Sequence, residues 1–230
     1  MDRPYVYINI AATADGKIDT FERRGSAISS QRDKERVDKL RAEADAVMVG
    51  GHTLHGEDPK LTVKSESLRA DRLARGFAPN PAKVGVSSRL NLKPDSNFLN
   101  VGSAQIFLFT TSQTDEHQLS MLRSCGTEIF IHDGERINLN LMLETLKNKG
   151  INRLMVEGGA TLNFELMRLG LVDELTIFVA PMIFGGESAP TTAAGSGLVR
   201  SEAIPLKLIE SQSWEDGGVL LRYQFEKRSK

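Results

Sequence analysis

Short apolar runs alternate with longer amphipathic runs along this 230-residue chain, and that alternation constrains the fold more than any other feature. The apolar runs are rich in β-branched and aromatic residues, a pattern typical of buried strands. The expected strands are Pro4–Ala12, Ala46–Val49, Lys83–Val86, Ile106–Phe109, Glu128–Ile131, Arg153–Val156, Glu174–Ala180, Leu206–Ser211 and Val219–Phe225. The expected helices are Gln31–Ala44, Ser65–Arg75, Asp115–Arg123, Leu139–Leu146 and a stripe of Leu162, Leu166 and Leu169.

Strand–helix alternation predicts an α/β fold with a mostly parallel central sheet flanked by helices, because parallel strands need crossover connections. The last three expected strands have little helix between them, which indicates antiparallel strands at the C-terminus. Ligands of such sheets bind outside the carboxyl ends of the strands. No repeat, low-complexity tract or linker interrupts the chain, so one domain over residues 1–230 is expected.

The charges of the chain nearly cancel, since 29 Lys and Arg against 30 Asp and Glu give a net charge of −1. Nucleic-acid and membrane-surface partners are therefore not expected, because no positive field attracts phosphates or anionic lipids. The most apolar stretches are too short to span a bilayer, and the N-terminus does not resemble a signal peptide. A single cysteine, Cys125, excludes an internal disulfide. Together these features favour a cytoplasmic protein.

The strand Arg153–Val156 is followed directly by two glycines and an expected helix. Gly158 and Gly159 permit a tight turn and a close approach of a ligand to the backbone. The amides at the start of the helix that follows would suit a diphosphate. A glycine-rich turn without a ligand explains the pattern equally well. P-loop, G-x-G-x-x-G and H-E-x-x-H motifs do not occur in the sequence.

A second polar segment follows the strand Ala46–Val49 and contains His52, His55, Glu57 and Asp58. Imidazole and carboxylate groups can bind a metal ion. Nothing in their spacing fixes a coordination geometry, and exposed loop histidines are the commoner explanation. We therefore expect no metal site.

Charged residues mark two further places. Asp15 and Lys17 lie around a glycine just past the first strand, where they would position and protonate a substrate, although a solvated turn with a weak ion pair is the simpler reading. The charged run Arg32–Glu43 is expected to be the solvated face of a helix. Arg41 stands out in this run because a guanidinium pairs bidentately with phosphate.

Taken in order, the segments resemble the reductase domain of the bifunctional riboflavin-biosynthesis deaminase/reductase, and still more its stand-alone relatives. Those relatives reduce the 5′-phosphate of diamino-ribosylamino-pyrimidinone. The matching segments are Tyr7–Lys17, Ile28–Ser30, Leu40–Ala42, Asp45–Val63, Ser88–Leu90, Val156–Leu162 (VEGGATL) and Val172–Thr191. The resemblance implies a dihydrofolate-reductase-like fold, NADPH as hydride donor (NADH being the alternative) and a homodimer.

The activity implied by the resemblance is NADPH-dependent reduction of the ribosylamino group of a pyrimidinone 5′-phosphate to the ribitylamino form. Lys17 would donate the proton or polarise the reacting group, and Asp15 would orient Lys17. Two alternatives stay open. One is another pterin or pyrimidine reductase of the same fold, dihydrofolate reductase included. The other is a regulatory protein that binds NADP without turnover.

The resemblance also assigns binding residues. The implied cofactor contacts are Thr53, Glu57, Ser88, Arg89, Leu90, Asn91, Gly158, Gly159, Ala160 and Thr161. The implied substrate contacts are Arg41, Leu61, Lys64 and Glu157. Arg89 would pair with the cofactor's 2′-phosphate, whereas Arg41 and Lys64 would bind the substrate's phosphate. The chain departs from the family at Glu57 and Ser87, where aspartates are usual, and at Lys64, where arginine is frequent.

Overall fold

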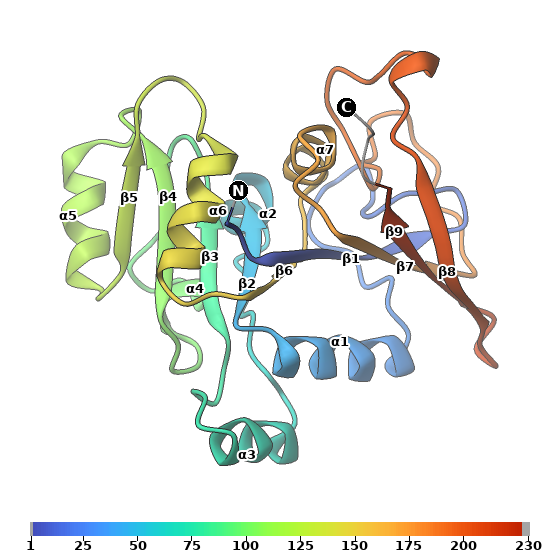
Figure 1. The fold of residues 1–230 in the computed structure, drawn as a ribbon, viewed down its shortest axis with the longest axis horizontal. Helices are drawn as coiled ribbons and strands as arrows, with labels where there is room; N and C mark the ends of the chain where they lie inside the picture. Colours follow the sequence, from blue (N-terminus) through green and yellow to red (C-terminus); the bar gives the residue numbers. More distant parts are fainter. Residues whose placement is uncertain (1, 227–230) are drawn as a thin grey trace. The chain divides into compact units, whose positions relative to one another are not determined.

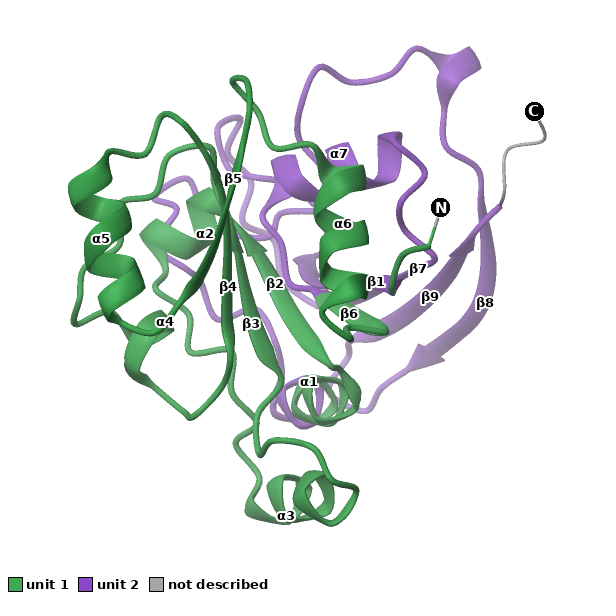
Figure 2. Cartoon of the chain, turned by 60° about the vertical axis from the view of Figure 1, so that its left-hand side comes forward, with its two compact units in different colours: residues 1–4, 36–155 green, residues 5–35, 156–230 purple. Residues whose placement is uncertain are grey.

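The computed structural model describes residues 2–226, which form two compact units (Figure 2). Of the described residues, unit 1 comprises 2–4 and 36–155, and unit 2 comprises 5–35 and 156–226. The expected single domain over residues 1–230 stays a prediction.

The strands of unit 1 succeed one another across its sheet in the order β5-β4-β3-β2-β6 (Figure 1), and β2, β3, β4 and β5 pair in parallel. The strands are β2 (Ala46–Gly50), β3 (Ala82–Val86), β4 (Ile106–Thr111), β5 (Glu128–His132) and β6 (Arg153–Val156). Every residue of β2, β3 and β4 is buried, as in parallel strands that are covered on both faces. Figure 2 shows α5 and α6 on opposite faces of these strands.

In chain order the helices of unit 1 lie between its strands, except α1, which precedes β2. They are α1 (Gln31–Glu43, whose first turn belongs to unit 2), α2 (Gly51–Gly56), α3 (Glu66–Ala74), α4 (Asn97–Asn100), α5 (Glu116–Ser124) and α6 (Leu139–Asn148). Ser65, Asp115 and Asn138 accept first-turn amide hydrogen bonds and so determine where α3, α5 and α6 begin. No helix among the described residues is long and apolar enough to cross a membrane.

Unit 2 contains a second group of strands in the order β1-β7-β9-β8. Its elements are β1 (Tyr5–Thr13), α7 (Ala160–Arg168), β7 (Glu174–Ala180), the short 3-10 helix η1 (Arg200–Glu202), β8 (Leu206–Ser213) and β9 (Val219–Phe225). β1 and β7 are parallel, whereas β9 is antiparallel to both β7 and β8. The register of the β8–β9 pair shifts between Leu208 and Glu210. Phe178 stacks on Trp214 in the core of this unit.

The predicted α/β class, the parallel strands and the antiparallel C-terminal strands are confirmed. Three local expectations were wrong. α2 and α4 were missed, because each is a single short turn without an apolar stripe. Leu169 is the exposed C-cap of α7, and the buried face of that helix instead includes Asn163 and Phe164. The charged run in α1 is not fully solvated, since Asp33 and Asp38 are buried.

Candidate active site

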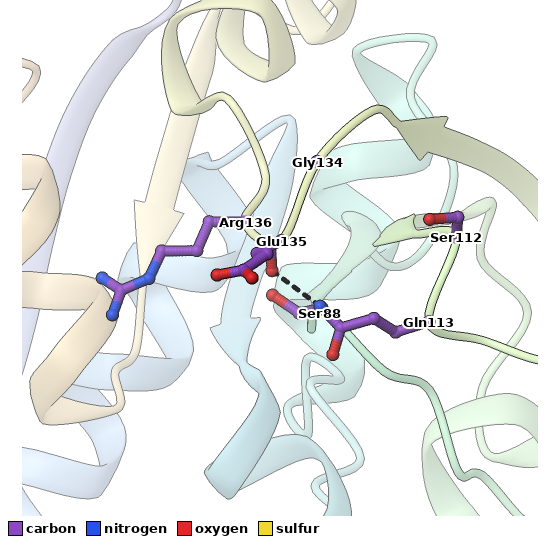
Figure 3. A pocket seen from close by; sticks show the side chains of 6 residues that line it. All are labelled: Ser88, Ser112, Gln113, Gly134, Glu135 and Arg136. Carbon is purple, nitrogen blue, oxygen red and sulfur yellow. Dashed lines mark hydrogen bonds between the residues drawn. The ribbon is translucent and has the colours of Figure 1, made fainter.

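In unit 1 the carboxyl ends of neighbouring parallel strands form a pocket. The loops after β3, β4 and β5 enclose about 560 Å³ (Figure 3). The lining residues are Ser88, Ser112, Gln113, Gly134, Glu135 and Arg136. The side-chain amide of Gln113 donates a 2.8 Å hydrogen bond to the Glu135 carbonyl and so links two of these loops. The pocket therefore has one arginine and one glutamate together with neutral hydrogen-bonding groups.

The Ser88 carbonyl anchors the segment after β3, because it accepts hydrogen bonds from the hydroxyls of Thr110 (3.2 Å) and Thr111 (2.8 Å). Of the four cofactor residues predicted in this segment, Ser88 alone lines the pocket. Leu90 is buried, whereas Arg89 and Asn91 are exposed. A fixed backbone thus presents Ser88 to the pocket and leaves the Arg89 side chain in solvent.

The helix α2 packs against the same segment. A Cβ atom on Gly51 would lie 2.6 Å from the Ser87 hydroxyl oxygen, so any larger residue here would force the Ser87 side chain to move. His55 Nε2 lies 3.2 Å from both the Ser87 hydroxyl and the Arg89 carbonyl. Thr53 is buried within α2, and Glu57 is its exposed C-cap. The structure therefore brings the segment of Thr53 and Glu57 against that of Ser88 and Arg89.

The polar residues around α2 do not converge on one point. The Asp58 carboxylate accepts hydrogen bonds from the amides of Asn97 (2.8 Å) and Phe98 (2.9 Å), whereas His55 faces Ser87. Within residues 2–226 no group of three or more His, Cys, Asp or Glu side chains is arranged to hold a metal ion.

The predicted substrate residues of unit 1 lie around the segment 61–65. Arg41 Nη1, on α1, donates to the Thr62 carbonyl at 3.1 Å. Leu61 is buried and has a positive φ of 50°, a strained conformation for a branched side chain. The Lys64 side chain is exposed, and its amide donates to Asp38 at 2.6 Å. The structure therefore brings Arg41, Leu61 and Lys64 into one neighbourhood.

In unit 2 the turn after β1 holds Asp15 and Lys17. The Thr13 hydroxyl donates to Asp15, and the Gly185 amide donates to the same carboxylate at 2.8 Å. These hydrogen bonds, the Thr13 bond foremost, hold the pKa of Asp15 below its ordinary value and keep the carboxylate charged. Lys17 Nζ donates to the Ala189 carbonyl at 3.2 Å. The ammonium group is thus held by Ala189, while Asp15 faces the loop at Gly185.

The predicted glycine turn of unit 2 lies between β6 and α7. Gly158 has a φ of 107°, and a Cβ atom at this residue would meet no atom within 4 Å. A cis peptide bond joins Gly158 to Gly159. Gly159 is the N-cap of α7 and has no side chain to satisfy the first-turn amides. Open space therefore lies beside the turn at the positive end of a nine-residue helix.

A segment that the sequence left as irregular joins these two places in unit 2. It contacts the Lys17 turn at one end, where Lys17 forms a β-bridge with Thr191. At the other end the Ala194 amide donates to the Ala160 carbonyl at 3.1 Å, and Asn163 donates to Thr192 at 3.1 Å. Residues 189–194 thus border both Lys17 and the start of α7. Periodicity gave no signal for this role, and the resemblance matched the segment Val172–Thr191 without assigning it one.

Comparison with known proteins gives consistent matches over nearly the whole chain. The chain is 40% identical over 198 residues to a 2,5-diamino-6-ribosylamino-4(3H)-pyrimidinone 5′-phosphate reductase from Archaeoglobus fulgidus, covering 86% of this chain and 90% of that protein. A protein of the same name from Methanothermobacter thermautotrophicus is 39% identical, with 91% of this chain and 93% of that protein covered.

Solved structures show the fold. A pyrimidine reductase-like protein from Corynebacterium diphtheriae superposes with a TM-score of 0.82 at 21% identity and covers 98% of this chain and 93% of its own. Dihydrofolate reductase from Enterococcus faecalis superposes with a TM-score of 0.52 at 11% identity over 97% of each chain. The predicted dihydrofolate-reductase-like fold is confirmed. Because the model of the RibD C-terminal domain matches residues 4–221, this chain belongs to the RibD C-terminal domain family, as its resemblance to the riboflavin-biosynthesis reductases predicted.

Proposed function

We propose that this chain is an oxidoreductase of riboflavin biosynthesis that uses NADPH to reduce the ribosylamino group of a pyrimidinone 5′-phosphate to the ribitylamino form. One observation carries the proposal. Two relatives that are 39–40% identical along nearly their whole lengths are named 2,5-diamino-6-ribosylamino-4(3H)-pyrimidinone 5′-phosphate reductase.

The residues present fit a dinucleotide in unit 2 at the start of α7. A side chain at Gly158 would occupy the open space beside the turn, and Gly159 leaves the first-turn amides of α7 without a capping side chain. Amides and a helix N-terminus of this kind suit a diphosphate. We assign Gly158, Gly159, Ala160 and Thr161 to the diphosphate of NADPH.

The residues of unit 1 fit the adenosine end of the cofactor. The pocket at the carboxyl ends of β3, β4 and β5 has hydroxyl and amide groups for ribose oxygens, contributed by Ser88, Ser112 and Gln113. Arg89 is exposed next to Ser88, and its guanidinium suits a 2′-phosphate. Thr53 and Glu57 complete the proposed contacts. When bound, NADPH supplies the hydride that the reaction requires.

The charges of the side chains decide which part of the substrate each one is proposed to contact. Arg41 and Lys64 give two positive groups for the substrate's phosphate, and Arg41 is already anchored at Thr62. Glu157 accepts a hydrogen bond from the ring or the ribosyl group, and Leu61 contributes an apolar surface. A dephosphorylated substrate would therefore lose the interactions with both cations.

Reduction of the ring-opened imine adds a hydride at C1′ and a proton at the adjacent nitrogen. Lys17 Nζ is the proposed proton donor, and its position is fixed by the Ala189 carbonyl. The charged Asp15 fixes the turn that carries Lys17 through its bonds to Thr13 and Gly185. In this assignment Asp15 positions Lys17 indirectly, because it fixes the conformation of the turn that carries Lys17.

We further propose that the chain forms a homodimer through β8. Leu206, Leu208 and Ile209 are 39%, 50% and 47% exposed on this strand, which lies at one end of the strand order. An exposed apolar edge strand is a surface that a second copy can cover by packing or by strand pairing.

A steady-state assay tests the proposed function. The purified chain is mixed with NADPH and 2,5-diamino-6-ribosylamino-4(3H)-pyrimidinone 5′-phosphate, and the nicotinamide absorbance is followed while the product is identified by mass spectrometry. Formation of the ribitylamino product is the expected result. Faster turnover of dihydrofolate would indicate a pterin reductase, whereas NADPH binding without turnover of either substrate would indicate a regulatory protein. Replacing NADPH with NADH in the same assay measures the cofactor preference.

A further inference from the structure

The backbone between Thr62 and Ser65 lies outside every helix and strand. Side chains nevertheless form hydrogen bonds with every backbone amide and carbonyl from the Thr62 carbonyl to the Ser65 amide. Arg41 donates to the Thr62 carbonyl, and Asn80 accepts from the Val63 amide at 3.0 Å. Arg69 donates to the carbonyls of residue 63 (2.8 Å) and residue 64 (2.7 Å). Asp38 accepts from the amides of residues 64 (2.6 Å) and 65 (2.8 Å).

These side-chain hydrogen bonds take the place of the backbone hydrogen bonds that a strand or a helix would form. A segment without regular structure normally satisfies its backbone with water and keeps its freedom to move. Here α1 supplies Asp38 and Arg41, and α3 supplies Arg69. The backbone of the segment 62–65 is therefore fixed by side chains that arrive from two helices and from Asn80.

Asp38 is the most deeply buried of the charged groups among these anchors. Its side chain belongs to a residue that is only 8% exposed, and each carboxylate oxygen accepts one of two consecutive amides. Hydrogen bonds from amides to a carboxylate are stronger than those between neutral groups. An asparagine has the same shape but only one acceptor oxygen, so it can satisfy only one of the two amides.

We propose that Asp38 is a positioning residue for binding of the substrate's phosphate. By holding the amides of Lys64 and Ser65, it fixes the backbone from which Lys64 presents its ammonium group alongside Arg41. Lysine is a flexible cation, and a fixed Cα position reduces the freedom that it loses on binding an anion. The inference rests on the proposed function, because that function places a phosphate at Arg41 and Lys64.

The test compares Asp38→Asn with the unchanged chain on the phosphorylated substrate and on its dephosphorylated form. For the phosphorylated substrate we expect KM to rise about tenfold or more while kcat stays within about twofold, because the lost interaction is uniform binding energy. For the dephosphorylated form, kcat/KM stays within about twofold of the unchanged chain. The affinity for NADPH stays unchanged.

Matched controls separate positioning from folding. Asp71→Asn removes a carboxylate from the exposed surface of α3 and should leave both kcat and KM unchanged. Arg69→Gln releases the carbonyls of Val63 and Lys64, so it should reproduce the rise in KM even if Asp38→Asn does not fold. Asp38→Glu, which restores two acceptor oxygens, should recover part of the lost affinity.

Binding of ribose 5-phosphate, measured by calorimetry, distinguishes failure of this proposal from failure of the proposed function. If the unchanged chain does not reduce the pyrimidine but binds ribose 5-phosphate about tenfold more tightly than Asp38→Asn, the positioning role holds and the substrate assignment fails. An equal loss of kcat/KM on both forms of the substrate would show a merely structural role. Unchanged kinetics in both Asp38→Asn and Arg69→Gln would overturn the proposal. An unchanged chain that neither reduces the pyrimidine nor binds ribose 5-phosphate would overturn it too.

Discussion

Asp58 and Lys83 hold opposite ends of the short helix α4. The carboxylate of Asp58 accepts the amides at the start of the helix, and Lys83 Nζ donates to the carbonyls of Phe98 (2.8 Å) and Val101 (2.7 Å) at its end. Lys83 is completely buried within β3. A buried ammonium group therefore connects the central strand of unit 1 to the loop that precedes β4.

The first prediction concerns the pH dependence of stability. Burial lowers the pKa of Lys83 to about 8, and the charge of Asp58 opposes this shift only in part. Between pH 8 and about 10.5 the unfolded chain keeps a proton that the folded chain has released, so stability rises with pH. At about 1.4 kcal/mol per pKa unit, the rise is on the order of 3 kcal/mol. Urea unfolding between pH 7 and 10 measures it.

The variant Lys83→Met should lack this rise, because it has no proton to release at that position. Lys39→Met, which changes an exposed lysine of α1, serves as the control and should keep it. Identical pH profiles for the chain and for Lys83→Met would show that the buried ammonium does not titrate in this range.

The second prediction tests the proton donor. Lys17→Ala should lower kcat by about 100-fold or more, the range expected for loss of a positioned general acid, while the Kd for NADPH stays within about twofold. Stopped-flow turnover and fluorescence titration measure the two quantities. Lys34→Ala, on the exposed face of α1, is the control. Turnover that survives in Lys17→Ala would remove this residue from the mechanism.

The third prediction tests the glycine turn at α7. Gly158→Ala places a side chain in the open space beside the turn and also strains a backbone with a φ of 107°. We expect the Kd for NADPH to rise by tenfold or more, with a loss of unfolding free energy of about 1–2 kcal/mol from the strain. Titration and urea unfolding measure the two effects.

Gly170→Ala separates strain from ligand contact. Gly170 also has a positive φ, of 68°, and open space around it, but it follows the C-terminus of α7. This variant should lose similar stability and keep its affinity for NADPH. An equal loss of affinity in both variants would mean that strain alone, not the proposed diphosphate contact, weakens binding.

The fourth prediction concerns the choice between NADPH and NADH. Arg89→Gln should weaken NADPH binding about tenfold or more and leave NADH unchanged, because a charge-assisted bond to the 2′-phosphate contributes about 1.5–3 kcal/mol. Titration with each cofactor gives the ratio of the Kd for NADH to the Kd for NADPH. Arg136→Gln, which changes the arginine that lines the pocket, is the comparison. If this variant alters the ratio more, the 2′-phosphate partner is Arg136.

The fifth prediction tests the proposed dimer. Leu208→Glu places a charge on the exposed apolar edge of β8 and should convert dimers to monomers in sedimentation experiments. Ile131→Glu makes the same kind of change at an exposed residue of β5, in unit 1, and should leave the dimer intact. A monomeric unchanged chain would contradict the proposal directly.

The sequence predicted the regular elements well because strand-forming runs and amphipathic helices have clear periods. β6, β7 and β9 have the same bounds in the structure as in the prediction. α2 and α4 escaped prediction because a single turn has no period to detect. The buried Lys83 was unexpected for a different reason. A lysine in an apolar run gives no sign that two carbonyls, 15 and 18 residues away, are positioned to accept hydrogen bonds from its ammonium group.

The candidate site was predictable in its residues but not in its contacts. The strand-end positions of Asp15, Lys17 and Gly158 follow from the pattern alone. Thr13 is a local partner of Asp15, but Ala189, which holds Lys17, and Gly185, which binds Asp15, lie about 170 residues further along the chain, so local sequence could not reveal them. The pattern places Asp38 on a solvated helix face, because a charged run does not show which of its carboxylates turns inward to bind backbone amides.

The register shift between Leu208 and Glu210 has a consequence for how far assembly can proceed. Open-ended growth of fibres requires an edge strand whose hydrogen-bonding groups continue in an unbroken row. The extra residue at this irregularity interrupts that row in the middle of β8 and increases the local twist. The edge of unit 2 can therefore present apolar side chains to one partner while offering a poor template for an endless stack of chains.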